Sequence, residues 1–118
     1  MLSDVILTRG IDEGTIVSGV EHAIVYHSPT GFEWGYGGSG PAELALNILA
    51  QHMSKKAAWD LHQVFKWQVI AKQPYEGGII PRTFIEEWIT QNRIVSYNED
   101  DPDNVITEIE DFGTPGEP

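Results

Sequence analysis

The chain has 118 residues, no cysteine, 41% apolar residues and a formal net charge of −11. This length suggests one domain with one compact core, and the lack of cysteine excludes disulfides and thiolate metal sites. No apolar run approaches the roughly 18 residues that span a bilayer, so we expect a soluble, cytoplasmic protein without a membrane partner.

Four short segments near the N-terminus are predicted to be strands. They are rich in β-branched and aromatic residues, and glycine or proline separates them. Consecutive short strands of this kind favour a small antiparallel sheet. The four segments are Asp4–Gly10, Thr15–Gly19, Glu21–Ser28 and Phe32–Tyr36.

Helical patterns dominate the second half of the chain. Apolar residues at helical spacing predict a helix over 39–53 and a second over 55–72, which Ser54 would cap. Thr83 and Glu86 form a capping box that predicts a third helix, and residues 93–97 read as an edge strand. Strands followed by helices predict the α+β class: a small antiparallel sheet packed against about three helices.

The acidic surplus lies mostly at the C-terminal end. Residues 98–118 carry a net charge of −8, whereas residues 1–97 carry −3. We therefore divide the chain into an α+β domain over 1–97 and an acidic, partly disordered tail over 98–118. The tail either stays solvated or meets a basic site, on a partner or on the second helix. The scarcity of Lys and Arg argues against direct nucleic-acid binding.

A glycine-rich stretch, Gly35–Gly40, leads into the first helix. It matches G-x-G-x-x-G by letter, but a second helix follows instead of the strand that a dinucleotide fold requires. Two interpretations stay open: free N–H groups that bind an anion or nucleotide, or glycines that permit close packing. The candidate ligand-binding or partner-binding residues are Trp34, Tyr36, Gly37, Gly38, Ser39 and Gly40.

Ser39 itself has two interpretations. It is the expected N-cap of the first helix, and it also lies at a strand-to-helix turn, where some hydrolases place a nucleophile. Pro41 occupies a position where that nucleophile motif requires glycine. We expect no catalytic residue and favour a protein that is not an enzyme, while a small hydrolase that uses Ser39 stays open as the third alternative.

A stripe on the second helix is the other candidate surface. Lys55, Trp59, His62 and Lys66 share one side of this helix. The stripe is either a helix edge, where lysine stems surround a half-buried tryptophan, or a binding patch for a negatively charged partner. The histidines show no His-x-x-x-His spacing, so we expect neither a metal nor a cofactor.

The stretch HSPTGFEWGYGGSGPAELALNIL, residues 27–49, resembles a small uncharacterised family found in bacteria, archaea and their viruses. A weaker similarity continues through HQVFKWQVIAKQP, residues 62–74. The resemblance implies no established activity, cofactor or catalytic residue. It suggests a viral or mobile-element context.

Together these patterns predict a non-enzymatic binding protein. It would be a viral or mobile-element accessory factor that occupies a site on a host protein of defence or nucleic-acid processing. Its expected contacts are Trp34, Tyr36, Ser39, Lys55, Trp59 and Lys66. The alternative is a module that binds or sequesters an anionic small molecule, such as a nucleotide, at the glycine-rich helix start.

Overall fold

A computed structural model describes residues 2–12 and 14–96 of the chain. The chain divides into two compact units, Met1–Arg82 and a second that begins at Thr83. The first unit holds a sheet and two helices, and the second holds the rest of a third helix. The predicted α+β class is confirmed.

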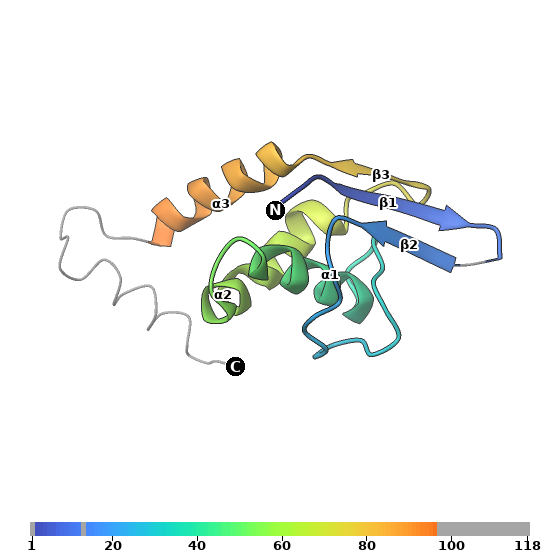
Figure 1. Cartoon of the computed structure of the whole chain (residues 1–118). Helices are drawn as coiled ribbons and strands as arrows, with labels where there is room; N and C mark the ends of the chain where they lie inside the picture. Colours follow the sequence, from blue (N-terminus) through green and yellow to red (C-terminus); the bar gives the residue numbers. More distant parts are fainter. Residues whose placement is uncertain (1, 13, 97–118) are drawn as a thin grey trace. The chain divides into compact units, whose positions relative to one another are not determined.

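The sheet has three antiparallel strands in the order β2-β1-β3 (Figure 1). Strand β1 is Val5–Gly10 and strand β2 is Gly14–Ser18, close to the first two predicted strands. Strand β3, Gly77–Ile80, is not among the strands that the sequence predicted. Gly77 has a φ of +107° and its α-carbon approaches the Leu7 carbonyl, so this strand starts at a position that only glycine fits.

The predicted strands over 21–28 and 32–36 are wrong. Residues 20–38, all of which the structure describes, form a long irregular connection between β2 and the first helix (Figure 1). Several backbone N–H groups of this connection donate to side chains of that helix instead of to a neighbouring strand. Side-chain acceptors thus satisfy the donors that a strand partner would have satisfied.

Helix α1, Ser39–Ala50, is the central element of the first unit. Every residue from Gly40 to Leu49 is buried, as expected for a helix that is apolar nearly all round. Gly38 occupies the N-cap position, and no side-chain hydrogen bond caps this end. The prediction that Ser39 caps the helix is therefore wrong, since Ser39 is its first residue.

Helix α2, Lys55–Phe65, begins as predicted: the Ser54 hydroxyl accepts a hydrogen bond from the Ala57 N–H. It continues into a π-helical turn, η1, Lys66–Ile70, instead of staying α-helical to residue 72. The Ala71 N–H donates to the Lys66 carbonyl at 2.7 Å, which closes that wider turn. Helix α1 packs against both α2 and η1.

Helix α3, Arg82–Ser96, includes residues 93–96, so the predicted edge strand at this position is wrong. Because the helix begins at Arg82, Thr83 lies inside it and does not cap it. Asp4 accepts a hydrogen bond from the Arg82 N–H at 2.8 Å. The predicted acidic tail, 98–118, lies outside the described residues. Among the described helices, none is long and apolar enough to cross a membrane.

Candidate functional site

The connection between β2 and α1 is anchored by a buried carboxylate. Glu43 is 0% exposed, and its oxygens accept hydrogen bonds from the backbone N–H of Tyr26 at 3.0 Å and of His27 at 2.6 Å. The same carboxylate pairs with His22 Nε2 at 2.6 Å. One side chain of α1 therefore holds three residues of the connection.

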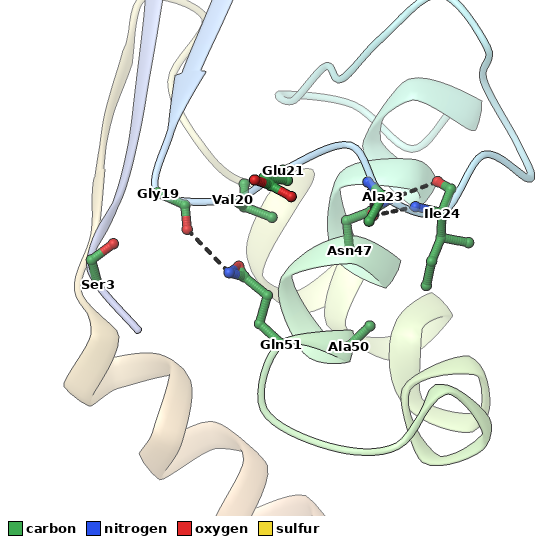
Figure 2. A pocket seen from close by; sticks show the side chains of 9 residues that line it. All are labelled: Ser3, Gly19, Val20, Glu21, Ala23, Ile24, Asn47, Ala50 and Gln51. Atoms are coloured by element: carbon green, nitrogen blue, oxygen red, sulfur yellow. Dashed lines mark hydrogen bonds between the residues drawn. The ribbon is translucent and has the colours of Figure 1, made fainter. Parts of the chain in front are cut away.

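Asn47 repeats this arrangement one helical turn later. Its Oδ1 accepts from the N–H groups of Ala23 at 3.0 Å and Ile24 at 2.8 Å (Figure 2). Its Nδ2 donates to the carbonyls of Ile24 and Glu43, both at 2.9 Å. Asn47 and Glu43 are four residues apart and share a helix face, so residues 22–27 are fixed along that face.

Hydrogen bonding keeps the Glu43 carboxylate charged in spite of its burial. Burial acts to raise the pKa of this carboxyl, but the bond to His22 and the two backbone N–H bonds outweigh it. The net effect lowers the pKa of Glu43 below its usual value. The anchor is thus an ionised group at neutral pH.

Two imidazoles meet beside this anchor. His27 Nε2 lies 2.9 Å from His62 Nε2, and His62 Nδ1 lies 2.7 Å from the Trp59 carbonyl oxygen. Since a carbonyl only accepts, His62 donates from Nδ1, and its Nε2 accepts from the Nε2–H of His27. Burial, chiefly, lowers the pKa of both histidines, and His62 is only 1% exposed. Both rings are therefore neutral at pH 7.

An aromatic surface is built on these anchors. We use this name for Val25, Tyr26 and Trp59. Tyr26 is 64% exposed and Val25 is 59% exposed, and the Tyr26 ring meets the Trp59 ring edge-on with centroids 4.7 Å apart. The His27 ring stacks parallel to Trp59 at 5.7 Å. The connection and α2 thus join to present rings to solvent in one fixed arrangement.

The imidazole nitrogens that meet in this cluster are taken up by contacts within the protein. Each of the two imidazoles occupies the other's Nε2, so they do not flank a space where a substrate would sit between an acid and a base. Within residues 2–12 and 14–96, no three His, Cys, Asp or Glu side chains form a group that could hold a metal ion. What the site offers is an ordered surface.

The glycine-rich corner is tightly packed. Trp34 is buried and donates from Nε1 to the Tyr75 carbonyl at 3.1 Å. Gly35 has a φ of +91° and donates its N–H to the Ile70 carbonyl at 3.0 Å. A Cβ at Gly37 would lie 2.1 Å from the Trp67 ring. The positive φ therefore accounts for Gly35, and the close approach of the Trp67 ring accounts for Gly37.

A pocket of about 470 Å³ adjoins this corner. Hydroxyl groups of Thr15, Ser28, Thr30 and Ser39 are among the side chains that line it. Glu33 is the only charged side chain among the described lining residues, and it pairs with Arg9 at 3.0 Å. The pocket thus combines a helix start with hydroxyls, but no cation lines it.

A second pocket, of about 490 Å³, lies beside the other end of α1 (Figure 2). Asn47 and Gln51 supply its amide groups. Both already bond to the connection, Asn47 as described above and Gln51 to the Gly19 carbonyl. The amides that line this pocket therefore hold the chain in place.

The predicted stripe on the second helix separates into exposed and buried parts. Lys55 is exposed and Trp59 is half-buried. His62 and Lys66 are buried, and Lys66 Nζ lies 3.4 Å from the Gly37 carbonyl oxygen and 4.5 Å from the Trp67 ring centroid. Lys66 therefore packs under the glycine corner and is not part of an exposed patch.

Sequence reasoning missed the anchors Glu43 and Asn47 and the pairing of His27 with His62. A signal for the anchors exists in the sequence: they are the only polar residues between Ala42 and Leu49. Two polar residues four apart in an otherwise apolar helix indicate a buried polar contact. The histidine pair joins residues 35 positions apart and left no such signal.

Comparison with known protein families gives one match. The model of a family described as "Family of unknown function (DUF6166)" matches residues 3–91, so the chain belongs to that family. The match covers the sheet, α1, α2 and η1, together with the connection that carries the anchors. No curated protein and no solved structure matches the chain.

Proposed function

We propose that this member of the DUF6166 family is a non-enzymatic binding protein that acts by occupying a site on another protein. The observation that supports this most directly is the aromatic surface. Tyr26 is 64% exposed and its ring lies against that of the half-buried Trp59, and the preceding residue, Val25, is exposed as well. Tyr and Trp are the residue types that most often dominate the energy of protein interfaces.

The rigidity of this surface is the second argument. The backbone of Tyr26 is held by Glu43, and its ring contacts the rings of His27 and Trp59. A contact that is already ordered loses less conformational entropy on binding than a flexible one. Lys55 lies one turn before Trp59 on the exposed side of α2 and would extend the contact area.

The proposed partner is a host protein of defence or nucleic-acid processing, met in the host cytoplasm by a factor of viral or mobile-element origin. The net charge of −11 supports a partner with a basic site, because opposite charge steers association. The motif of residues 27–49 supports the viral context through the resemblance given above. The charge also disfavours a direct nucleic-acid partner.

A small-ligand function is the second candidate, and the hydroxyl-lined pocket at the start of α1 supports it. Tyr36 and Ser39 line this pocket, and Gly37 and Gly38 lie next to them in the chain. Glu33 weakens the candidate for an anionic ligand, since it is the charged group at this place. Native mass spectrometry of freshly purified protein tests it: a bound small molecule that is lost in Gly40→Asp would support it.

The binding proposal is tested by comparative capture from host lysate. Tyr26→Ala removes the exposed ring, and Ile11→Ala is the matched control, because Ile11 is 98% exposed in the turn after β1. A genuine partner binds the wild type and Ile11→Ala equally. We expect it to bind Tyr26→Ala at least tenfold more weakly in surface plasmon resonance.

The outcome against the proposal is equally definite. If every protein captured by the wild type is captured as well by a folded Tyr26→Ala variant, the aromatic surface is not the contact. A lysate that yields no partner at physiological salt would also count against it. Circular dichroism of both variants shows that a loss of binding does not reflect unfolding.

A further inference from the structure

We propose that the contact between His27 and His62 makes the aromatic surface dependent on pH, so that acidification separates Tyr26 from Trp59 while the rest of the unit stays folded. The biological role of this change rests on the function proposed above. The change itself is a property of the isolated protein and can be measured without a partner. It follows from where the protons lie in the histidine pair.

The pair has one place where an added proton is tolerated and one where it is not. A proton added at His27 Nδ1 leaves the bond from His27 Nε2–H to His62 intact. His62 already donates from Nδ1 to Trp59, so a proton added to it goes to Nε2. Two N–H groups would then face each other across 2.9 Å, and the contact would break.

His27 is the ring that moves when the contact breaks. His62 is 1% exposed, on α2, and bonded to the Trp59 carbonyl. His27 is half-buried on the connection, next in the chain to the exposed Tyr26. A charged imidazole gains hydration by leaving a buried place. Displacement of the His27 ring removes its stacking on Trp59 and its contact with the Tyr26 ring.

The charged groups around the pair set the balance. From α1, the Glu43 carboxylate favours the protonated state of both rings, and from η1, the Lys66 ammonium disfavours it. From the connection, His22 is bonded to Glu43, and Tyr26 meets the edge of His27. Burial remains the dominant effect and lowers the pKa of both histidines, so the change falls below their ordinary titration range.

The release is local because a different group holds the backbone. The hydrogen bonds of the Glu43 carboxylate lower its pKa, so acid neutralises this anchor only below the ordinary titration range of a glutamate. The N–H groups of Tyr26 and His27 therefore keep their acceptor, and Asn47 keeps Ala23 and Ile24. Acid frees the rings of the surface before it frees the connection.

The test follows the isolated protein by NMR between pH 7.5 and 4.5. The readouts are the ring signals of His27 and His62 and the nuclear Overhauser effect between the Tyr26 and Trp59 rings. We expect that effect to vanish as the second proton enters the pair. The methyl signals of Leu44 and Ile48 in α1 should stay dispersed, which shows that the core remains folded.

Two variants sharpen the test. His62→Gln keeps an oxygen that accepts from His27 Nε2–H but takes up no proton, so the contact between the rings of Tyr26 and Trp59 should persist to pH 4.5. His52→Gln is the matched control, because His52 lies in the turn after α1 and outside the pair. It should lose the contact as the wild type does.

Three results would overturn the inference. One is a wild-type contact that survives after both rings have titrated. Another is a loss of the contact at the same pH in a folded His62→Gln variant. The third is a simultaneous collapse of the α1 methyl signals, which would mean global unfolding. If His62→Gln does not fold, the wild-type midpoints alone decide.

The same measurement separates this inference from the proposed function. If the rings part in acid but no partner depends on Tyr26, the pH response stands and the binding function fails. If a partner is found, its affinity for the wild type should fall at least tenfold between pH 7.5 and the end of the transition. Its affinity for His62→Gln should change far less.

Discussion

The two halves of the connection between β2 and α1 are held in place by different means. The first half, 20–28, is fixed by buried polar side chains of α1, which take up its backbone donors. The second half, 32–38, is fixed by close backbone packing and by single hydrogen bonds to carbonyls near η1. One half depends on charge and amide groups, and the other depends on the absence of side chains.

The half with the recognisable sequence motif is therefore not the half in which charged and titratable side chains meet. The glycine-rich half carries the letters of a nucleotide motif, yet a positive φ accounts for Gly35 and packing against Trp67 accounts for Gly37. The first half carries no nucleotide motif, yet it brings together Glu43, His22, His27 and His62. If the two halves are held differently, substitutions in them should change the free energy of unfolding by different amounts.

Glu43→Gln should have the largest effect. The substitution keeps the size of the side chain but removes the charge that binds His22 and two backbone N–H groups. Loss of a buried charged acceptor costs about 3 kcal/mol. Urea unfolding followed by circular dichroism measures the free energy of unfolding. Glu21→Gln is the control, since Glu21 is exposed, and it should change stability by less than about 0.5 kcal/mol.

Equal stabilities for Glu43→Gln and Glu21→Gln would mean that the charge of Glu43 does not stabilise the connection. The connection would then owe its conformation to packing in both halves. The NMR signals of the Tyr26 and His27 amides give a second check, because hydrogen bonds to a carboxylate protect these two protons from exchange with solvent.

Asn47→Asp should rank second. Aspartate keeps the oxygen that accepts from Ala23 and Ile24 but loses the two N–H groups that donate to the Ile24 and Glu43 carbonyls. It also adds a negative charge one turn from Glu43. Two lost hydrogen bonds cost about 2 kcal/mol, and the same urea assay measures the loss. A stability equal to that of the wild type would show that the amide donors contribute nothing.

The sequence predicted the parts of this fold that depend on local pattern. The strands β1 and β2 and the start of α1 follow from the spacing of apolar residues, and the Ser54 cap follows from capping preferences. The strand predicted over 21–28 failed because backbone N–H groups at these positions donate to Glu43 and Asn47, which replace a strand partner. No local pattern states which side chain, about twenty residues away, will supply an acceptor.

The candidate site was predictable only in part, for the same reason. Trp59 stood out as an aromatic on a basic helix, but its neighbours Tyr26 and His27 come from another element. Lys66 was assigned to the exposed stripe by helical spacing, whereas it is buried under Gly37. Spacing gives the side of a helix, and only the tertiary structure gives what covers that side.

Near neutral pH, the loss of unfolding free energy on mild acidification should be smaller than the losses caused by Glu43→Gln and Asn47→Asp. Both histidines have a lowered pKa in the folded protein, so the unfolded chain takes up their protons first as the pH falls below about 6.5. Stability is complete above that pH and declines below it, by at most about 1.4 kcal/mol per pH unit for each histidine. Unfolding in urea at pH 7.5, 6.5 and 5.5 measures the decline.

His62→Gln should flatten this decline, because one of the two proton acceptors is gone. Protonation of Glu43 adds a further loss at acidic pH, since a carboxyl with a lowered pKa stabilises the fold only while it is ionised. A stability that rises on acidification from pH 7.5 would contradict the placement of both histidines.

Gly37→Ala should have the smallest effect, and it addresses the other half of the connection. The new Cβ would lie 2.1 Å from the end of the Trp67 ring. Trp67 is more than half exposed, and the atoms that the new Cβ would meet lie at the far end of its side chain. The ring can therefore rotate away. Moving it disturbs only its packing on the corner and on Lys66, which we expect to cost about 1 kcal/mol.

Gly78→Ala is the matched control, because a Cβ there meets nothing within 4 Å. It should be neutral to within about 0.5 kcal/mol. A loss at Gly37 near that of Glu43→Gln would mean that the glycine corner has no room to adjust, and that both halves are equally rigid. A loss near 1 kcal/mol supports the contrast: the glycines fit the chain to its neighbours, whereas the buried carboxylate determines its course.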